Sequence, residues 1–447
     1  MGFEYQKLAS GEFQMPAGWE VTTIADVACI NELAITKRTA PEHIEYIDIA
    51  SVDKGRLMAV QELPFEKAPS RARRVVRSKD SLISTVRPNL EHYLFVKEAK
   101  PNTIASTGFA VVSAKSVDPR FLYYYLTSKP FTAYLTRIAE SHTSAYPAFN
   151  PDVIENAELL LPTDPEQRTI AHILGSLDDK IELNRQMNRT LEKMAQAIFK
   201  SWFIDFDPVR AKAEGRDPGL PKEIADLFPD SFEDSELGPI PKGWKVRPIG
   251  EAVQCVGGST PSTKNPKYWD GGTNPFVTPK DMSSLISPVI LGTERHITDA
   301  GVEKISSRQL PVGTVLLSSR APIGYLAITE IPVSVNQGII AMICNGDLPN
   351  HYVLQWTRTN MDIIKSNAGG TTFAEISKRN FRPIPVVIPP LDLLDAFVDQ
   401  VGPLHQQLVL NCLESRELTA IRDTLLPKLI SGELRVPDAE KLVEGTV

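Results

Sequence analysis

Cysteine is scarce in this 447-residue sequence, which contains only Cys29, Cys255, Cys344 and Cys412, all far apart. Their spacing fits neither a zinc site nor a disulfide framework, and it is typical of a reducing cytoplasm. No apolar run reaches the roughly 18 residues that a membrane helix needs. The N-terminus shows no basic stretch followed by an apolar one, so we expect no secretory signal. These absences predict a soluble, cytoplasmic protein.

The motifs of catalysis are also missing. The glycine-rich stretch 257–264 lacks the Gly-Lys-Ser/Thr ending of a phosphate loop and is more typical of a turn. The stretch 273–279 has a single proline before Phe276, and no glycine-rich cofactor strand precedes it, so it is a poor amino-methyltransferase motif. The histidines form no metal-binding pair, and nothing activates a nucleophile. We therefore expect no catalytic residue, no metal site and no cofactor in this chain.

The net charge of −7 is unevenly distributed along the sequence. Residues 161–240 contain 10 basic and 16 acidic residues, and residues 389–447 contain 5 basic and 10 acidic residues. Residues 241–388 contain 15 basic and 10 acidic residues, whereas residues 1–160 are nearly neutral. Because the acidity is confined to two segments, the charge of the whole chain says little about its partners.

The sequence repeats itself with a period near 227 residues. Five matches occur in the same order in both copies. The matched pairs are Trp19 with Trp244, Tyr46 with Phe276, Arg87 with Arg320, Gly108 with Gly338, and Pro162 with Pro389. Small drifts in the offset are what loop insertions would produce. Each copy begins with short strand-like runs separated by Gly and Pro, which predict a β-rich domain.

A heptad pattern follows the β-rich part of each copy. The first seam consists of Ile170, Leu174, Leu177, Ile181, Leu191, Ala195, Ile198 and Trp202. The second seam consists of Phe397, Val401, Leu404, Leu408, Leu418, Leu425 and Leu429. Arg422 interrupts the second seam, and Pro403 predicts that the second helix effectively begins near Leu404.

These patterns predict an α+β fold with two pseudo-repeated mixed α/β domains, separated by two long antiparallel coiled-coil helices. The predicted segments are a first domain at 1–163, a long helix at 164–204, a spacer at 205–239, a second domain at 240–390, a second helix at 391–433, and a fraying tail at 434–447. Such a helix pair would hold two domains at a fixed separation, which suits two short DNA sequences with a fixed gap. An ordinary helical hairpin is the alternative, but it would leave the domain repeat unexplained.

Two polar residues, Asn184 and Asn411, occupy core positions of the two seams and lie one repeat apart. In an antiparallel pair of equivalent helices, residues at the midpoint face their own equivalents, so we expect these two side-chain amides to satisfy each other and fix the register. The flanking pairs would be Leu177 with Leu418, Leu191 with Leu404, Ile170 with Leu425, and Ile198 with Phe397. The alternative is that both amides tilt toward solvent.

Basic residues concentrate at 71–79 in the first copy, where the candidates for DNA contact are Arg71, Arg73, Arg74, Arg77 and Lys79, followed by Arg87. Such a cluster can contact phosphates, and guanidinium groups can read guanine edges. The alternative is a solvated loop. In the second copy the candidates are Lys264, Lys267, Lys280, Arg320, Asn336 and Gln337. Hydroxyl donors are expected from Ser84, Thr85, Ser318 and Ser319.

Several segments resemble the specificity subunits of Type I restriction–modification systems. Pro-x-Gly-Trp opens each half, 161–212 is similar to the central helical region of that family, 369–391 to the end of a recognition domain, and 425–434 to the terminal region. One departure from the family pattern is that the Pro-Glu-Gln of residues 165–167 does not return in the second half, where Leu393, Leu394 and their neighbours stand instead.

The resemblance implies a non-catalytic subunit that binds a bipartite double-stranded DNA target, with one half-site per domain. It also implies two methyltransferase subunits as partners, which carry S-adenosylmethionine, and restriction subunits that use ATP and Mg²⁺. Two alternatives come from other classes. A monomeric methyltransferase with duplicated recognition parts would need a cofactor loop, and a bivalent protein-binding scaffold would not bind DNA.

Overall fold

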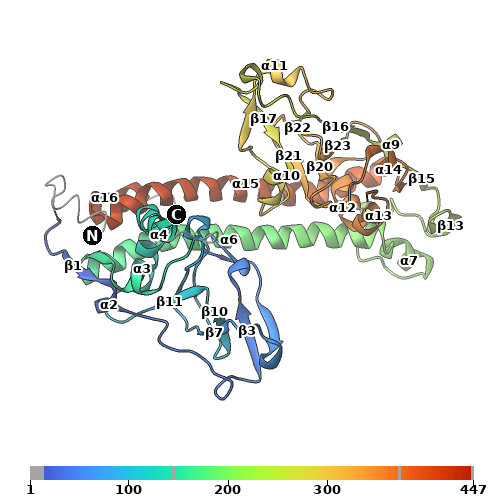
Figure 1. The fold of residues 1–447 in the computed structure, drawn as a ribbon. Coiled ribbons are helices and arrows are strands. Elements are labelled where there is room, and N and C mark those ends of the chain that lie inside the picture. Colours follow the sequence, from blue (N-terminus) through green and yellow to red (C-terminus); the bar gives the residue numbers. More distant parts are fainter. Residues whose placement is uncertain (1–14, 142–146, 371–373, 444–447) are drawn as a thin grey trace. The chain divides into compact units, whose positions relative to one another are not determined.

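The computed structural model describes residues 15–141, 147–370 and 374–443. Residues 1–14, where no signal pattern was found, and residues 444–447 of the predicted tail lie outside this description. The chain divides into two units, unit 1 with Met1–Ile181 and Arg416–Val447, and unit 2 with Glu182–Ser415. Each unit contains two main β-sheets and one part of each long helix, so the predicted α+β class is confirmed (Figure 1).

Unit 1 contains two four-stranded sheets. The first has the order β6 (Gln61–Pro64), β3 (His43–Ile47), β10 (Thr103–Ser106), β7 (Ala72–Val75), and β10 runs parallel to β3. The second has the order β2 (Ala28–Ile30), β11 (Phe109–Ala114), β8 (Ser81–Ser84), β9 (Tyr93–Phe95). Strands β1 (Glu20–Thr23) and β12 (Glu158–Leu161) pair antiparallel and join the two ends of the domain, and β4 (Val52–Asp53) pairs with β5 (Arg56–Leu57).

Short helices cover these sheets. They are α2 (Ile24–Val27), α3 (Pro119–Leu126), α4 (Lys129–Ser141), α5 (Asp152–Glu155), and the 3₁₀ turns η1 (Ile49–Ser51), η2 (Phe65–Lys67) and η3 (Pro88–Leu90). One buried cluster joins Phe121 of α3 and Leu159 of β12 to Leu174 and Leu425 of the long helices. The apolar seam of the helices is therefore part of the core of unit 1.

Unit 2 repeats this plan with a five-stranded and a three-stranded sheet. The larger sheet has the order β16 (Gln254–Gly257), β23 (Ile339–Ile343), β20 (Val315–Ser318), β21 (Leu326–Thr329), β18 (Val289–Ile290). The smaller has the order β19 (Arg295–Ile297), β17 (Asn274–Val277), β22 (Ser334–Val335), with β22 parallel to β17. Strand β15 (Lys245–Pro248) pairs with β24 (Pro385–Ile388), as β1 pairs with β12.

The helices of the unit 2 domain are α9 (Ile249–Ala252), α10 (Pro279–Ser283), α11 (Asp299–Val302), α12 (Asn350–Thr359), α13 (Met361–Ser366), α14 (Lys378–Phe381) and η4 (Pro266–Tyr268). The predicted spacer forms α7 (Asp207–Ala213), α8 (Lys222–Ala225) and the hairpin of β13 (Phe232–Ser235) and β14 (Gly238–Pro241). Phe206 and Phe228 of this region are buried in the core of unit 2, so the spacer is packed.

The hydrogen-bond pattern refines the sequence repeat by one residue. The N–H of Phe149 donates to the carbonyl of Thr85, and the N–H of Ile376 donates to the carbonyl of Ser319. The isolated bridges that follow join Val86 to Ala148 and Arg320 to Glu375. Arg320 therefore corresponds to Val86, and the match of Arg320 with Arg87 was wrong. Because neighbouring residues of an extended segment point to opposite faces, a shift of one residue changes which side chain faces outward.

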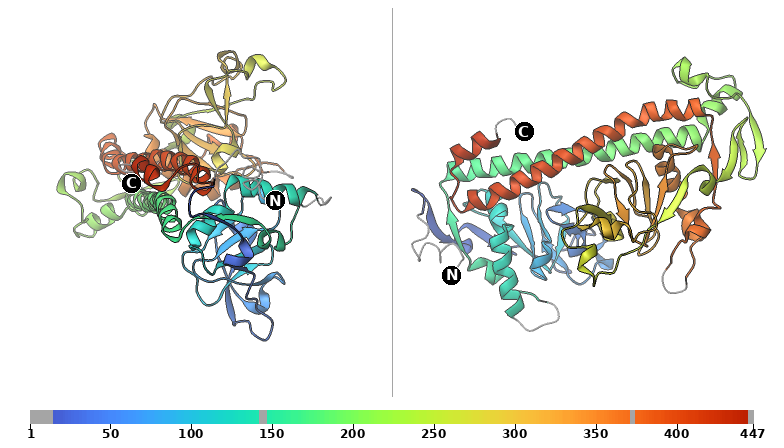
Figure 2. Two further views of the ribbon diagram at one scale, coloured as in Figure 1. Left: turned by 90° about the vertical axis from the view of Figure 1, so that its left-hand side faces the viewer. Right: turned by 90° about the horizontal axis from the view of Figure 1, so that it is seen from above.

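The two long helices are α6 (Asp164–Phe203) and α15 (Leu391–Ile430). In unit 1 an ion pair joins Asp178 to Arg422 at 2.6 Å, and another joins Glu166 to Arg435, just after α15, at 2.5 Å. In unit 2 the side chains of Asn188 and Asn411 are 2.8 Å apart, and the ring centroids of Phe199 and Phe397 are 6.0 Å apart. Numbers rise along α6 as they fall along α15, so the helices are antiparallel within each unit, as predicted; Figure 2 shows both helices from two further directions.

Helix α15 begins at Leu391, well before Pro403, so the expected start near Leu404 was wrong. The reason is packing, because Phe397 and Val401 are buried against the core of unit 2 and hold the first turns in place. The predicted fraying tail is also wrong as far as Val443. Residues Val436–Val443 form α16, with Ala439 fully buried in the core of unit 1.

The two Pro-x-Gly-Trp motifs have different partners at the helix starts. Trp19 donates from its indole N–H to Glu166 at 2.9 Å, and Glu166 also accepts from the Thr163 hydroxyl at 2.9 Å, in the manner of a helix cap. In unit 2 the buried indole N–H of Trp244 has no partner. The departure at Leu393, which stands one repeat after Glu166, explains this difference, since a leucine offers no acceptor.

Among the described residues, no helix is long and apolar enough to cross a membrane.

Candidate nucleic-acid interface

In unit 1 a turn at residues 106–108 brings the predicted basic segments together. The N–H of Thr107 donates to the carbonyl of Arg71 at 2.8 Å, and the N–H of Thr85 donates to the carbonyl of Gly108 at 2.9 Å. Arg87, which follows that contact with a left-handed φ of 47°, is exposed. The basic strand β7 and the segment after β8 therefore meet at this turn, which we name the unit 1 turn face (residues 71–74, 85–87 and 106–108).

Two of the predicted cations on or near this face already have carboxylate partners. Arg71 donates to the Tyr46 hydroxyl and pairs with Asp48 at 2.7 Å, and these contacts raise the pKa of its guanidinium. Arg77 pairs with Glu32, which raises its pKa in the same way. Both guanidinium groups are about half exposed, so solvent weakens these pairs.

The other basic residues of this segment lie in different environments. Arg73 lies over the ring of Phe65, with its guanidinium carbon 5.4 Å from the ring centroid. The Nε of Arg74 is buried without a hydrogen-bond partner. Lys79 is exposed in a left-handed turn with a φ of 73°. The basic run therefore does not form one uniform patch, and its side chains differ in how readily they can reach a ligand.

Unit 2 builds the equivalent face around the turn 336–338. The N–H of Ser319 donates to the carbonyl of Gly338 at 2.9 Å, as Thr85 does to Gly108 in unit 1. A side chain at Gly338 would meet Pro279 and Arg320 at 3.1 and 3.4 Å, so these residues touch the turn. The Thr260 hydroxyl donates to Gln337 at 2.7 Å. We name residues 260, 278–280, 319–320 and 336–338 the unit 2 turn face.

The unit 2 turn face contains several of the predicted residues. Lys280 pairs with Glu294 at 2.8 Å, and Arg320 pairs with Glu375 at 3.6 Å. Gln337 is exposed, whereas Asn336 accepts a hydrogen bond from the N–H of Gly338 at 2.9 Å. Lys264 and Lys267 are exposed on the loop that continues from Thr260. The contacts of this face thus gather polar and basic side chains from four segments of the chain.

The expected hydroxyl donors are not available to a ligand. Ser84, Thr85, Ser318 and Ser319 are all at most 8% exposed. Thr85 donates to the carbonyl of Gly108 at 3.0 Å, and Ser318 donates to the carbonyl of Pro322 at 2.8 Å. Thr85 thus holds the turn of unit 1, and Ser318 holds the loop that follows β20. The expectation that the four hydroxyls contact DNA was wrong, because all four are buried, and serine and threonine at strand ends often bond to the nearby backbone.

The helices also carry a polar network, which differs from the predicted amide pair. Asn184 donates to the carboxylate of Glu414 at 2.6 Å and lies 3.5 Å from the carbonyl of Asn411. The side-chain amide of Asn411 instead donates to Asn188 at 2.8 Å. Asn184 and Asn411 are buried next to each other but do not pair amide to amide. Asn188 lies on the same seam, four residues after Asn184 and three before Leu191, but the sequence analysis passed over it because the seam was followed through its apolar members.

Polar contacts also hold the β-rich part of each unit against the long helices of the same unit. In unit 1, Asp178 accepts from the Tyr124 hydroxyl at 2.7 Å, and Arg120 pairs with Asp179 at 2.7 Å. Burial opposes the charge of Asp179, but Arg120 and Lys97 outweigh it and lower its pKa. Gly175, the one glycine in α6, leaves room for Arg120, since a side chain there would meet the guanidinium at 2.4 Å.

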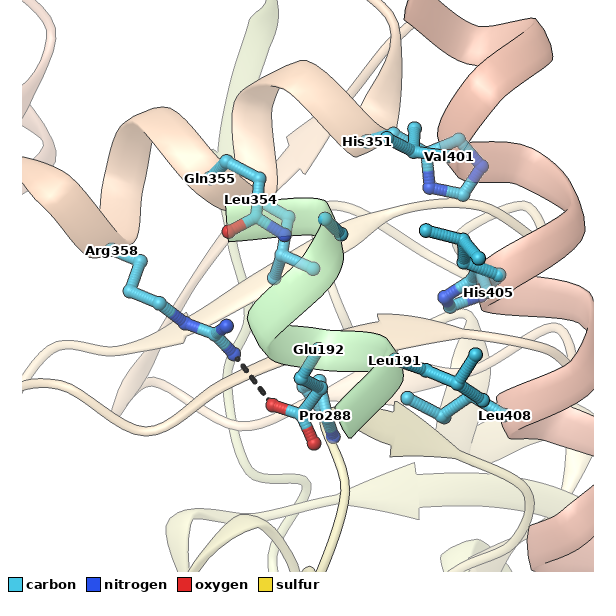
Figure 3. A pocket seen from close by; sticks show the side chains of 12 residues that line it. Leu191, Glu192, Pro288, His351, Leu354, Gln355, Arg358, Val401, His405 and Leu408 are labelled. Carbon is cyan, nitrogen blue, oxygen red and sulfur yellow. Dashed lines mark hydrogen bonds and ion pairs between the residues drawn. The ribbon is translucent and has the colours of Figure 1, made fainter. Parts of the chain in front are cut away.

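In unit 2 a small pocket occupies the corresponding junction (Figure 3). Arg358 of α12 pairs with Glu192 of α6 at 3.2 Å, shown by the dashed line. The rings of His351 and His405 are 4.9 Å apart, and burial together with His405 lowers the pKa of His351 to about 4. Burial also raises the pKa of Glu192. Within the described residues, no group of histidine, cysteine and carboxylate side chains is arranged to hold a metal ion.

Two segments of the chain match the same known protein family. The model of the Type I restriction modification DNA specificity domain matches residues 16–193 and again residues 241–401. The chain belongs to the family of Type I restriction–modification specificity subunits. As a specificity subunit it recognises a DNA target sequence and is not the catalytic component.

Two curated relatives match nearly the whole chain. The HindI specificity subunit of Haemophilus influenzae is 30% identical over 436 residues, which cover 88% of this chain and 94% of that protein. The MjaIX specificity subunit of Methanocaldococcus jannaschii is 25% identical over 439 residues, 95% of each chain. The solved S subunit from M. genitalium has a TM-score of 0.53 at 15% identity and covers 94% of this chain and 98% of that one, which supports the fold.

Proposed function

We propose that the chain binds a bipartite double-stranded DNA target, with one half-site read by each unit. The β-rich part of a unit, without its long helices, would read the half-site, and we call it the recognition part. The observation that carries this proposal is the repeated turn face, in which the same backbone hydrogen bonds gather basic and polar side chains in unit 1 and in unit 2. The half-site contacts would come from Arg71, Arg73, Arg74, Arg77, Lys79 and Arg87 in unit 1, and from Lys264, Lys267, Lys280, Arg320, Asn336 and Gln337 in unit 2.

The physical argument rests on charge and on hydrogen-bond geometry. Arginine and lysine neutralise phosphates, and this term supplies most of the sequence-independent affinity. Exposed amides such as Gln337 can donate to and accept from base edges in the major groove. Basic side chains occur on both faces, and Gln337 adds an exposed amide to the unit 2 face. The buried Thr85 hydroxyl fixes the turn of unit 1, and the Asn336 side chain fixes the turn of unit 2. Fixed turns lower the cost of ordering the side chains on binding.

Partner subunits would supply the chemistry. Two methyltransferase subunits would bind S-adenosylmethionine, and restriction subunits would use ATP and Mg²⁺, in the cytoplasm where the DNA is accessible. This chain would then scaffold them on the target and contribute no catalytic group. The pure chain is therefore expected to transfer no methyl group to DNA and to hydrolyse no ATP, and methyl transfer by the pure chain would contradict this assignment.

The experiment that tests the modular proposal is an exchange of one recognition part. Residues 20–150 are replaced by the matching segment of another specificity subunit, and the methylated motif is read in cells that express the methyltransferase partner. One half-site is expected to change while the other is retained. If both half-sites changed, the units would not read the target independently.

A second experiment tests the basic run. Arg71, Arg73, Arg74 and Arg77 are changed to alanine together, and DNA affinity is measured over a series of salt concentrations. Each lost phosphate contact lowers the slope of log affinity against log salt by about 0.9. An unchanged slope would show that the run is a solvated loop.

A further inference from the structure

The hydrogen bonds of the two units match a basic residue in unit 2 to the basic run of unit 1. In unit 1 the N–H of Val76 donates to the carbonyl of Thr103, and the N–H of Lys79 donates to the carbonyl of Val96. In unit 2 the N–H of Leu310 donates in the same way to the carbonyl of Val333, and the N–H of Gly313 to the carbonyl of Thr329. Lys79 and Gly313 also share a left-handed φ, of 73° and 82°. This common pattern aligns Arg308 with Arg74, within the basic run, a match that the sequence repeat does not reveal because the local offset differs from 227.

The backbone of Arg308 is held in an unusual conformation. Its φ is 53°, a left-handed value that is uncommon for arginine. The N–H of Arg308 donates to the carbonyl of Ile305 at 2.9 Å, and its carbonyl accepts from the Ser334 hydroxyl at 3.2 Å. The strained residue is thus fixed on both sides, and the side chain it carries is exposed. Strain that the surroundings maintain in this way is often associated with a binding role.

The position of Arg308 places it beside the unit 2 turn face. Ser334, which bonds to Arg308, lies in β22, and the turn 336–338 continues directly from the end of that strand. Within the described part of the chain no carboxylate pairs with Arg308, whereas Lys280 and Arg320 on the same face each have a carboxylate partner. Arg308 can therefore meet an anion without first giving up an ion pair.

We propose that Arg308 contacts a phosphate of the DNA backbone in the half-site bound by unit 2. This inference rests on the proposed function, because it requires that the unit 2 turn face is the surface that meets DNA. The contact is assigned to phosphate because a single guanidinium on an exposed backbone turn supplies charge, and most protein–DNA contacts of this kind go to the backbone.

The left-handed conformation allows variants that remove the charge and keep the fold. Glycine and asparagine both tolerate a positive φ, so Arg308→Gly and Arg308→Asn should fold at least as well as the wild type. Arg308→Lys keeps the charge. Arg168→Ala serves as the control, because Arg168 is an exposed arginine of α6 in unit 1 for which no ion pair is present among the described residues.

The test measures binding of the full chain to a fluorescein-labelled duplex of random sequence between about 50 and 200 mM salt. Arg308→Gly and Arg308→Asn are expected to lower the slope of log affinity against log salt by about 0.9, while Arg308→Lys and Arg168→Ala leave it unchanged. If wild-type chain binds and both charge-removing variants keep its slope, the proposal for Arg308 is overturned and the proposed function stands. If the wild type does not bind the duplex, both are overturned.

Discussion

Asn411 of α15 donates a hydrogen bond from its side-chain amide to the side-chain oxygen of Asn188 in α6, at 2.8 Å. Both residues are at most 4% exposed. The amide of Asn188 in turn lies 3.2 Å from the hydroxyl of Ser287, which belongs to the recognition part of unit 2. One buried chain of hydrogen bonds therefore joins both helices to the recognition part, and it allows only the helix register in which every amide has a partner.

This network predicts a strong coupling between its two asparagines. Asn411→Leu leaves the buried amide of Asn188 without its donor, and Asn188→Leu leaves that of Asn411 without its acceptor, so each change should cost about 1–3 kcal/mol of unfolding free energy. The double variant removes both amides together and should cost less than the sum of the single changes. Urea denaturation of all four proteins gives the coupling energy, and additive costs would contradict the paired arrangement.

The fold could be predicted from the sequence because its main signals are periodic. The heptad seam and the repeat gave the long helices, their antiparallel direction and two similar domains. The start of α15 was mispredicted because a single proline was weighed without the packing of Phe397 and Val401, which only the folded core provides. The tail was mispredicted for the same reason, since Ala439 is buried against residues distant in sequence.

The candidate site was less predictable. Sequence shows which residues are basic, but it does not show that Arg71 and Arg77 face carboxylates that lie far away along the chain. The match of Arg320 to Arg87 failed by one residue, because an insertion shifts the offset between copies and sequence similarity cannot locate it. The correspondence of Arg308 with Arg74 follows only from the backbone hydrogen bonds of the two units.

Glu166 is predicted to stabilise unit 1 through three separate contacts. It accepts from Trp19 and Thr163 and pairs with Arg435 of the segment after α15. Glu166→Leu removes the cap and leaves the Trp19 N–H without an acceptor, so we expect a loss of about 2 kcal/mol by urea denaturation. In a Trp19→Phe background, which has no indole N–H, the same change should cost less. An equal cost in both backgrounds would contradict the role of the indole.

We predict that the buried His351 side chain makes the stability of unit 2 decrease in acid. Burial and the neighbouring His405 lower the pKa of His351 to about 4 in the folded chain, while an unfolded histidine titrates near 6.5. Glu330 and Glu192 are the carboxylates near this junction. Between these values the unfolded chain binds a proton that the folded chain does not. Stability should therefore be full above about pH 6.5 and fall by up to about 3 kcal/mol as the pH drops to 4.

The pH dependence is checked by urea denaturation of wild type and His351→Asn at several pH values. The variant should lose the part of the acid sensitivity that His351 contributes. His172→Asn removes an exposed histidine of α6 in unit 1 and serves as the control for the loss of one imidazole. A profile of His351→Asn that parallels the wild type between pH 6.5 and 4 would show that His351 is protonated in the folded chain.

The ion pair of Arg77 with Glu32 allows a test of whether Arg77 itself contacts DNA or whether DNA affinity depends only on the net charge of the unit. Glu32→Gln keeps the shape of the side chain but releases Arg77 from its ion pair. If Arg77 contacts a phosphate, the released guanidinium no longer has to exchange partners, so DNA affinity should rise.

Glu42→Gln is the matched control, because it removes one exposed negative charge from the same unit and no ion pair of Glu42 is present among the described residues. Binding to a labelled duplex at fixed salt should therefore improve more for Glu32→Gln than for Glu42→Gln. In an Arg77→Ala background, Glu32→Gln should lose its advantage over Glu42→Gln, since only the general loss of negative charge remains. Equal gains from both glutamate changes in the wild-type background would mean that Arg77 does not touch DNA.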